Sequence, residues 1–226
     1  MKNLTKGQLK IIKSPKKFQS IFSQIHICKD EEGKEFLFKE TNSNEVIRNE
    51  IIAWNLLKLI KIRRISYVSK QSLGKKKGLT LTYLKKARLL SKRKLTKKQL
   101  NQLKKIILFD IWVGNRDRHT ANIFLYKNNL IPFDHGKIFK EKTGKSIRFI
   151  KLNVGTRLSK EWPDILVKLQ NKTNEEALKI LGFTKREINY VENINDSKIK
   201  KACLGNNQIF NFLKFRRNNF TKFKFY

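Results

Sequence analysis

Cysteine, acidic residues and long apolar runs are all scarce in this chain of 226 residues. Its two cysteines, Cys28 and Cys203, stand far apart without the spacing of a zinc or redox motif, which argues against a disulfide-stabilised fold and fits a reducing, cytoplasmic location. No apolar run reaches the roughly 18 residues that a membrane-spanning helix needs, so we expect no transmembrane segment. Residues 1–6 carry charge but no apolar stretch follows them, so we also expect no secretory signal.

The shortage of acidic residues leaves a large positive charge. Only 18 aspartates and glutamates oppose 52 lysines and arginines, which gives a formal net charge of +34. Such a field attracts polyanions, for example nucleic acid, an acidic membrane or an acidic protein. However, the lysines are spread along the whole chain, and Lys, Asn, Ile and Phe are all abundant, as an A/T-rich coding bias produces. The charge therefore bears on partners and says nothing about chemistry.

Hydrophobic residues are frequent enough to build a core. They make up 39% of the chain, and aromatic residues make up 11%, which excludes disorder as a description of the whole chain. At this length we expect one domain, or two small lobes that share a cleft.

The patterns in the first half predict strands around one helix. Residues 21–28 and 34–39 flank a short turn that contains glycine, and their β-branched and aromatic content predicts a hairpin. Apolar residues then recur at helical spacing over 44–60, which predicts an amphipathic helix. Residues 65–70 and 78–84 are typical of two further strands.

The second half is mainly helical in pattern. Thr96 and Gln99 form a capping-box pair at the start of a long helix, and Gly114 ends it as a left-handed cap. Two short strands follow at 123–126 and 130–133. After about residue 160 the chain looks helical, with capped starts at Thr173 and Thr184.

Together these patterns predict an α+β fold with two lobes. A small lobe, residues 1–84, combines antiparallel strands with one helix, and a mostly helical lobe, residues 85–226, completes one catalytic domain.

The polar segment 114–136 carries the residues that point to chemistry. Phosphoryl transfer needs a carboxylate to orient and deprotonate the accepting hydroxyl, and hard oxygen ligands to hold magnesium against the phosphates. Asp117 is followed five residues later by Asn122, and Asp134 comes after an intervening hairpin with Gly136 behind it. The hairpin would bring all three side chains together. Alternatively, each of them only satisfies the backbone of a turn.

A lysine and a glutamate in the small lobe complete the same template. Lys39 ends a predicted strand, and Glu50 lies on the following helix, whose other faces are apolar. A carboxylate on such a helix is expected to pair with a cation. The alternatives are a surface lysine at a strand end and a solvated helix residue.

These segments resemble the HipA-like kinases. The similarity is most specific over 109–122 (Phe-Asp-Ile-Trp-Val-Gly-Asn-Arg-Asp-Arg-His-Thr-Ala-Asn) and 130–136 (Leu-Ile-Pro-Phe-Asp-His-Gly), and it extends over about 20–140. Type II phosphatidylinositol 4-kinases carry a related N-x-D-R-x-x-x-N and D-x-G pair. Lys39 and the pair Asn49 and Glu50 are also similar to HipA-like proteins.

The resemblance implies a protein-kinase-like fold that binds ATP and magnesium. It implies Asp117 as the catalytic base, Asn122 and Asp134 as metal ligands, and Lys39 as a phosphate contact held by Glu50. Backbone groups of the hinge, Tyr83 and Leu84, would meet the adenine.

The acceptor and the phosphate loop are less well defined. The resemblance favours a protein serine or threonine as acceptor. Alternatives are a lipid or small-molecule hydroxyl, or a basic nucleic-acid-binding pseudokinase. One departure from the family is that no glycine-rich phosphate loop precedes Lys39.

The end of the chain interleaves aromatic residues with cations over 212–226. Bases could stack on such rings while the cations meet phosphates, or the stretch could lie on an anionic bilayer. In both cases Arg216, Arg217, Lys222 and Lys224 would contact the partner. The third possibility, which we favour, is a last helix that packs its apolar residues, Ile209, Phe212, Leu213 and Phe220, into the core.

Overall fold

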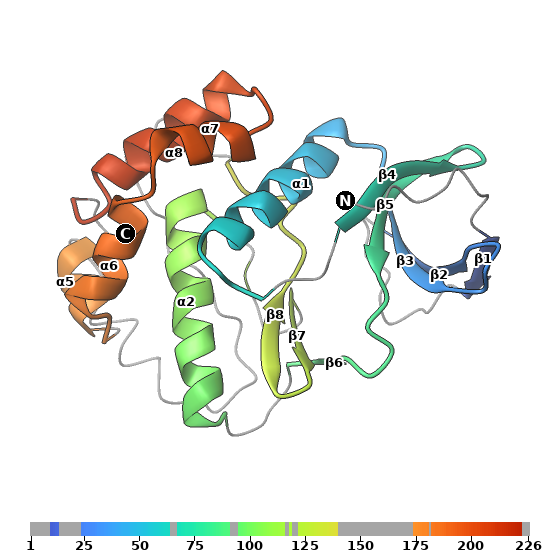
Figure 1. Ribbon diagram of the computed structural model, residues 1–226, viewed down its shortest axis with the longest axis horizontal. Coiled ribbons are helices and arrows are strands. Elements are labelled where there is room, and N and C mark those ends of the chain that lie inside the picture. The colour runs from blue at the N-terminus through green and yellow to red at the C-terminus, as the bar shows by residue number, and fades with distance from the viewer. Residues whose placement is uncertain are drawn as a thin grey trace.

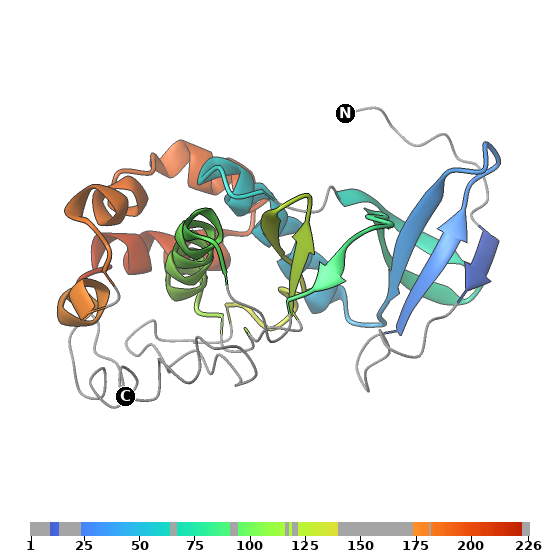
Figure 2. The same ribbon diagram turned by 90° about the horizontal axis from the view of Figure 1, so that it is seen from below.

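A computed structural model describes residues 10–13, 24–63, 67–90, 95–115, 118, 122–139, 174–180 and 182–222. An antiparallel sheet forms one end of the molecule, and helices form the other (Figure 1). Helix α1 and a small second sheet lie between these two parts, as the view from below also shows (Figure 2). The predicted α+β, two-lobed architecture is confirmed.

The small lobe is built on five antiparallel strands in the order β1-β2-β3-β5-β4. Successive side chains of the central strand β3 point to opposite faces of the sheet. Phe36 and Phe38 form a buried cluster with Cys28 on one face, whereas Leu37 and Lys39 lie on the other. The strands are β1 (Lys10–Lys13), β2 (Gln24–Lys29), β3 (Glu35–Glu40), β4 (Tyr67–Leu73) and β5 (Lys76–Thr82).

Helix α1 (Asn44–Leu59) packs with the helical lobe. The Ser43 side chain caps it by accepting a hydrogen bond from the Val46 amide. Its buried face joins the large hydrophobic core that the later helices share, and the Asn55 side chain donates to the Ala202 carbonyl at 3.2 Å. Because α1 packs into the core of the later helices, packing does not mark where the small lobe ends. The predicted lobe boundary between residues 84 and 85 stays a prediction.

Helix α2 (Lys97–Val113) begins and ends as its sequence predicts. Thr96 and Gln99 form the reciprocal capping box, and Gly114 adopts a left-handed conformation with φ of 65°. Its apolar face, Leu103, Ile107 and Ile111, is buried, whereas Leu100 at its start is 36% exposed. The small sheet, in the order β6-β7-β8, lies beside this helix and consists of β6 (Arg88–Leu89), β7 (Ile123–Tyr126) and β8 (Asn129–Pro132).

The remaining described helices are α5 (Asn174–Ile180), α6 (Lys185–Glu192), α7 (Asp196–Ala202) and α8 (Asn207–Asn218). The capping box predicted at Thr184 is present in α6, with Glu187 as its second member. Thr173, the other expected cap, lies outside the described residues. In the part of the chain that the structure describes, every helix is too short or too polar to cross a membrane.

Helix α8 shows that the C-terminal stretch packs into the core. Ile209, Leu213 and Phe220 are buried, as we favoured. Arg216 is only 1% exposed, so the expectation that it contacts nucleic acid or a membrane is wrong. Arg217 is half-buried and pairs with Asp196. A local pattern of cations and rings does not reveal which cations face inward. Lys222 is exposed, and Lys224 lies outside the described residues.

Gly78 of β5 provides a test of the sheet. A Cβ atom there would overlap the carbonyl oxygen of Lys39, so Gly78→Ala must push two strands apart. We expect this variant to lower the free energy of unfolding by about 3 kcal/mol, as measured by urea denaturation. Gly74→Ala in the same hairpin is the control. It meets nothing within 4 Å but has a φ of +58°, so it should cost only about 1 kcal/mol. Equal losses for both variants would contradict the close approach.

Candidate active site

Three elements meet at the ammonium group of Lys39. The lysine lies on β3, is 4% exposed, and donates to Glu50 Oε1 of α1 at 2.6 Å and to Asp134 Oδ1 at 2.7 Å. Asp134 follows β8 and lies 95 residues after Lys39 in the sequence. Burial alone would lower the pKa of Lys39, but the two carboxylates raise it above its ordinary value. The structure therefore brings these three predicted residues together, with the lysine charged.

Glu50 also fixes the loop that contains Asp134. Its Oε1 accepts a hydrogen bond from the His135 backbone N–H at 3.0 Å, and Oε2 lies 3.4 Å from His135 Nδ1. Burial by itself would raise the pKa of the Glu50 carboxyl, whereas Lys39 and His135 hold it well below its usual range. The carboxylate is thus ionised and serves two partners at once.

Asn49, the residue before Glu50, binds backbone carbonyls of the same loop. Asn49 is buried, and its side-chain amide donates to the carbonyls of Gly136 at 3.0 Å and Ile138 at 3.1 Å. Gly136 packs against Val46, since an added Cβ would lie 2.9 Å from Val46 Cγ1. Helix α1 and the Asp134 loop are therefore joined by hydrogen bonds and by close packing.

A cleft opens beside Lys39, between the five-stranded sheet on one hand and β7, α1 and the Asp134 loop on the other. Aliphatic side chains of β2, β3 and β5 line it, together with Phe124 and Phe133, whose rings stack with their centres 4.0 Å apart. Tyr83 and Leu84 lie on its wall where the chain leaves β5, and Lys39, Glu50 and Asp134 lie on it as well. A site with apolar walls and a few charged groups suits a flat ring that carries an anionic group.

A buried network that the sequence analysis did not single out supports the loop between α2 and β7. Arg118 is fully buried and donates to both carboxylate oxygens of Asp110, at 2.8 and 3.0 Å. Its Nη1 donates to the carbonyls of Asn122 and Phe133, both at 2.8 Å. Asn115 also donates to Asp110, at 2.7 Å. The signal in the sequence was Asp110 itself, because a carboxylate amid apolar helix residues needs a buried cation.

Comparison with known proteins agrees with this geometry. Residues 36–198 match the family described as Phosphatidylinositol 3- and 4-kinase, which is more than half of the chain. The chain belongs to the phosphatidylinositol 3- and 4-kinase family. No curated protein matches it. As a member of this family it is an ATP-dependent kinase of the protein-kinase-like superfamily, and the family uses ATP and a divalent cation.

A solved kinase shares the fold. The crystal structure of a Helicobacter pylori proinflammatory kinase, CtkA, resembles this family member with a TM-score of 0.54 and 11% identity. The likeness covers 96% of this chain and 92% of that chain. At this level of identity the likeness concerns the fold, and it confirms the predicted kinase-like arrangement of two lobes.

Two predicted site residues of this kinase, Asp117 and Asn122, are not among the described residues that meet at Lys39. Asp117 lies outside the described residues. Asn122 is buried, its backbone carbonyl accepts from Arg118 and from the Phe133 N–H, and it is not among the described residues that line the cleft. The roles of both residues remain predictions.

The described residues of this kinase fit a magnesium ion that takes most of its ligands from phosphate and water. Asp134 offers a carboxylate whose side chain is 36% exposed in the cleft. No group of three or more His, Cys, Asp or Glu side chains in the described part of the chain could enclose a metal. Magnesium in kinases is typically held by one or two carboxylates together with substrate phosphates, so such a cage is not required.

The Lys39–Glu50 pair predicts how stability depends on pH. Because the pKa of Glu50 is lower in the folded than in the unfolded chain, its contribution is present above about pH 5 and is lost as the pH falls below about 4. The Glu50→Gln variant lacks this proton uptake. Its free energy of unfolding should therefore fall less steeply in acid, by up to about 1.4 kcal/mol per pH unit.

Urea denaturation between about pH 6 and pH 3 measures both slopes. Glu45→Gln, at the exposed start of the same helix, is the matched control. Equal slopes for wild type and Glu50→Gln would contradict the ionised state of this carboxylate beside Lys39.

Proposed function

We propose that the protein transfers the γ-phosphoryl group of magnesium–ATP to the hydroxyl of a protein serine or threonine. The observation that carries the proposal is the pairing of buried Lys39 with Glu50 and with Asp134, beside a cleft with apolar walls. Kinases use such a lysine to contact nucleotide phosphates, and they need a glutamate to hold it.

Each group has a role that follows from its chemistry. Lys39 binds the phosphates, Glu50 orients it, and the backbone near Tyr83 and Leu84 meets the adenine. Asp134 and Asn122 supply hard oxygens, and a magnesium ion bound there would neutralise charge on the phosphates. Asp117 orients the acceptor hydroxyl and takes its proton.

The proposed phosphoryl acceptor rests on sequence motifs. A protein serine or threonine is favoured by the resemblance of 109–136 to HipA-like kinases. An inositol-lipid hydroxyl is the second candidate, and the match of residues 36–198 to the phosphatidylinositol 3- and 4-kinase family supports it. Both acceptors are alcohols, so the same catalytic base and the same metal ligands serve either reaction.

Replacing Asp117 should separate chemistry from binding. Asp117→Asn keeps the shape of the side chain but removes the base, so we expect transfer to fall by about a hundredfold or more while ATP affinity changes little. Rates of transfer from labelled ATP and calorimetric binding of magnesium–ATP measure the two effects. A variant that transfers at the wild-type rate would show that Asp117 is not the base.

Replacing Asp134 should act on the metal. Asp134→Asn should reduce the ratio of ATP affinity measured with magnesium to that measured with EDTA, because the amide is a weaker magnesium ligand than the carboxylate. The ratio is used because the variant also loses a partner of Lys39, which affects both conditions. An unchanged ratio would contradict a role in metal binding.

The acceptor can be identified by the fate of the label. The purified protein is incubated with γ-labelled ATP, a cell lysate, and phosphatidylcholine vesicles with or without phosphatidylinositol. Label that protease treatment releases from large species supports a protein acceptor. Label in the organic extract, dependent on phosphatidylinositol, supports the lipid. Neither transfer nor magnesium-dependent ATP binding would contradict the proposed function.

A further inference from the structure

The last turn of α2 is held by groups from outside the helix. A helix leaves its last four carbonyl groups without partners within the helix. Here the Asp110 carbonyl accepts from the backbone N–H of Asn115 at 2.9 Å, and the Val113 carbonyl accepts from Phe139 at 3.2 Å. The two carbonyls between them, those of Ile111 and Trp112, both accept from one guanidinium group, that of Arg216 on α8. The Ile111 carbonyl also accepts from the Gly114 N–H, at 3.4 Å.

Arg216 is bound there on several sides. Its Nε donates to the Trp112 carbonyl at 2.9 Å, and its Nη2 donates to the Ile111 carbonyl. The guanidinium lies 5.3 Å from the centre of the Phe212 ring, one turn earlier on α8. With only 1% of the residue exposed, the charge has exchanged water for carbonyl oxygens and a ring face.

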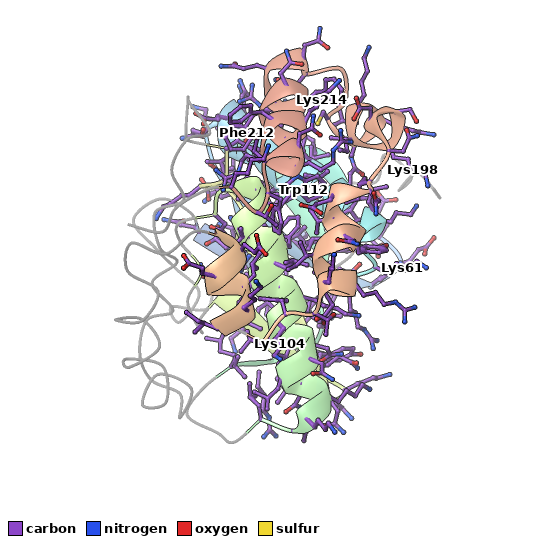
Figure 3. All side chains as sticks on the ribbon, turned by 90° about the vertical axis from the view of Figure 1, so that its left-hand side faces the viewer. Lys61, Lys104, Trp112, Lys198, Phe212 and Lys214 are labelled. Atoms are coloured by element: carbon purple, nitrogen blue, oxygen red, sulfur yellow. The ribbon has the colours of Figure 1, made fainter. Side chains whose placement is uncertain are left out.

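The same contact zone includes both loops of the site. Figure 3 looks onto the helical end and labels Trp112 and Phe212 where α2 and α8 meet; the Trp112 indole N–H donates to the Leu213 carbonyl at 3.2 Å. Phe212 packs edge-on against Phe139, with ring centres 6.0 Å apart. Phe139 lies five residues after Asp134, and Gly114 opens the loop that contains Asp117.

Gly114 shows how closely these parts fit. A Cβ added to it would lie 3.4 Å from the Phe212 ring and 3.8 Å from Arg216 Cζ. The chain therefore leaves α2 directly against the arginine and its stacking ring. Any shift of the α2 terminus would be passed to Asn115 and then to Arg118, whose partner Asp110 lies in the same last turn.

We propose that Arg216 is a positioning residue for phosphoryl transfer: by capping α2 from α8, it fixes where the loop with Asp117 begins, and through Phe212 it holds Phe139, in the segment that follows Asp134. This inference rests on the proposed function. The C-terminal carbonyls carry the negative end of the helix dipole, and a guanidinium donates to two of them in a fixed geometry. The residue is not among the described residues that line the cleft.

The neighbouring arginine is a matched control. Arg217 donates to the Ile194 carbonyl and pairs with Asp196, which ties α8 to the start of α7. It therefore supports the same helix as Arg216 through contacts that do not involve α2. Arg217→Gln should lower the melting temperature without changing transfer by the folded protein.

The experiment compares Arg216→Gln, Arg216→Lys and Arg217→Gln in the full chain. For Arg216→Gln we expect kcat to fall by about tenfold or more, while the KM for ATP and the calorimetric Kd for magnesium–ATP stay within about threefold. Arg216→Lys keeps the charge and donors for the carbonyls, so it should recover part of kcat. If kcat for Arg216→Gln falls no more than for Arg217→Gln, the proposal is wrong.

Hydrogen exchange tests the positioning role of Arg216 separately from the proposed kinase function. Amide protection at Gly114, Asn115 and Phe139 should fall in Arg216→Gln and stay at the wild-type level in Arg217→Gln. If wild type shows no transfer at all, the proposed function fails, and this pattern alone decides whether Arg216 holds both loops. If Arg216→Gln does not fold, Arg216→Lys replaces it. Because an ammonium lacks the planar fork that reaches two carbonyls, its kcat and its protection at these amides should still lie below those of Arg217→Gln, and values equal to those of Arg217→Gln for both would overturn the proposal.

Discussion

One buried ammonium group connects the parts of this molecule. Lys39 comes from the sheet, Glu50 from α1 and Asp134 from the loop after β8, so three distant segments meet at a single charge. An unpaired charge in such a place would be strongly destabilising, whereas here each carboxylate compensates it. The cleft exists only when all three segments are docked. The same interaction therefore supports the fold and prepares the site.

Around this charge the loops are held mainly through their main chain. Asn49 binds the carbonyls of Gly136 and Ile138, and Arg118 binds those of Asn122 and Phe133. Carbonyl groups are present whatever the side chain, so a few buried polar residues fix the path of long segments. This suits a chain whose composition is dominated by lysine, because only these few positions must resist change.

The local patterns predicted much of this arrangement. The strand predicted over 34–39 placed Lys39 near its end, as in β3, and the capping box at Thr96 located the start of α2. What local patterns could not supply were contacts between remote segments. Arg216 meets Ile111 across 105 residues, and the sequence around it resembles a cationic surface equally well. That Lys39 and Asp134 would lie in one site was predictable only because a known motif relates them, and their direct hydrogen bond was not predicted.

The position of α1 has a mechanical consequence. Both carboxylates that bind Lys39 belong to one body, because α1 shares the core of the helical lobe and is joined to the Asp134 loop. The strands carry the lysine alone. A rotation that opened the cleft would therefore have to draw one cation out from between two fixed anions, while α1 kept its place. Nucleotide phosphates that offer the lysine further negative charge would then decide how easily the sheet moves.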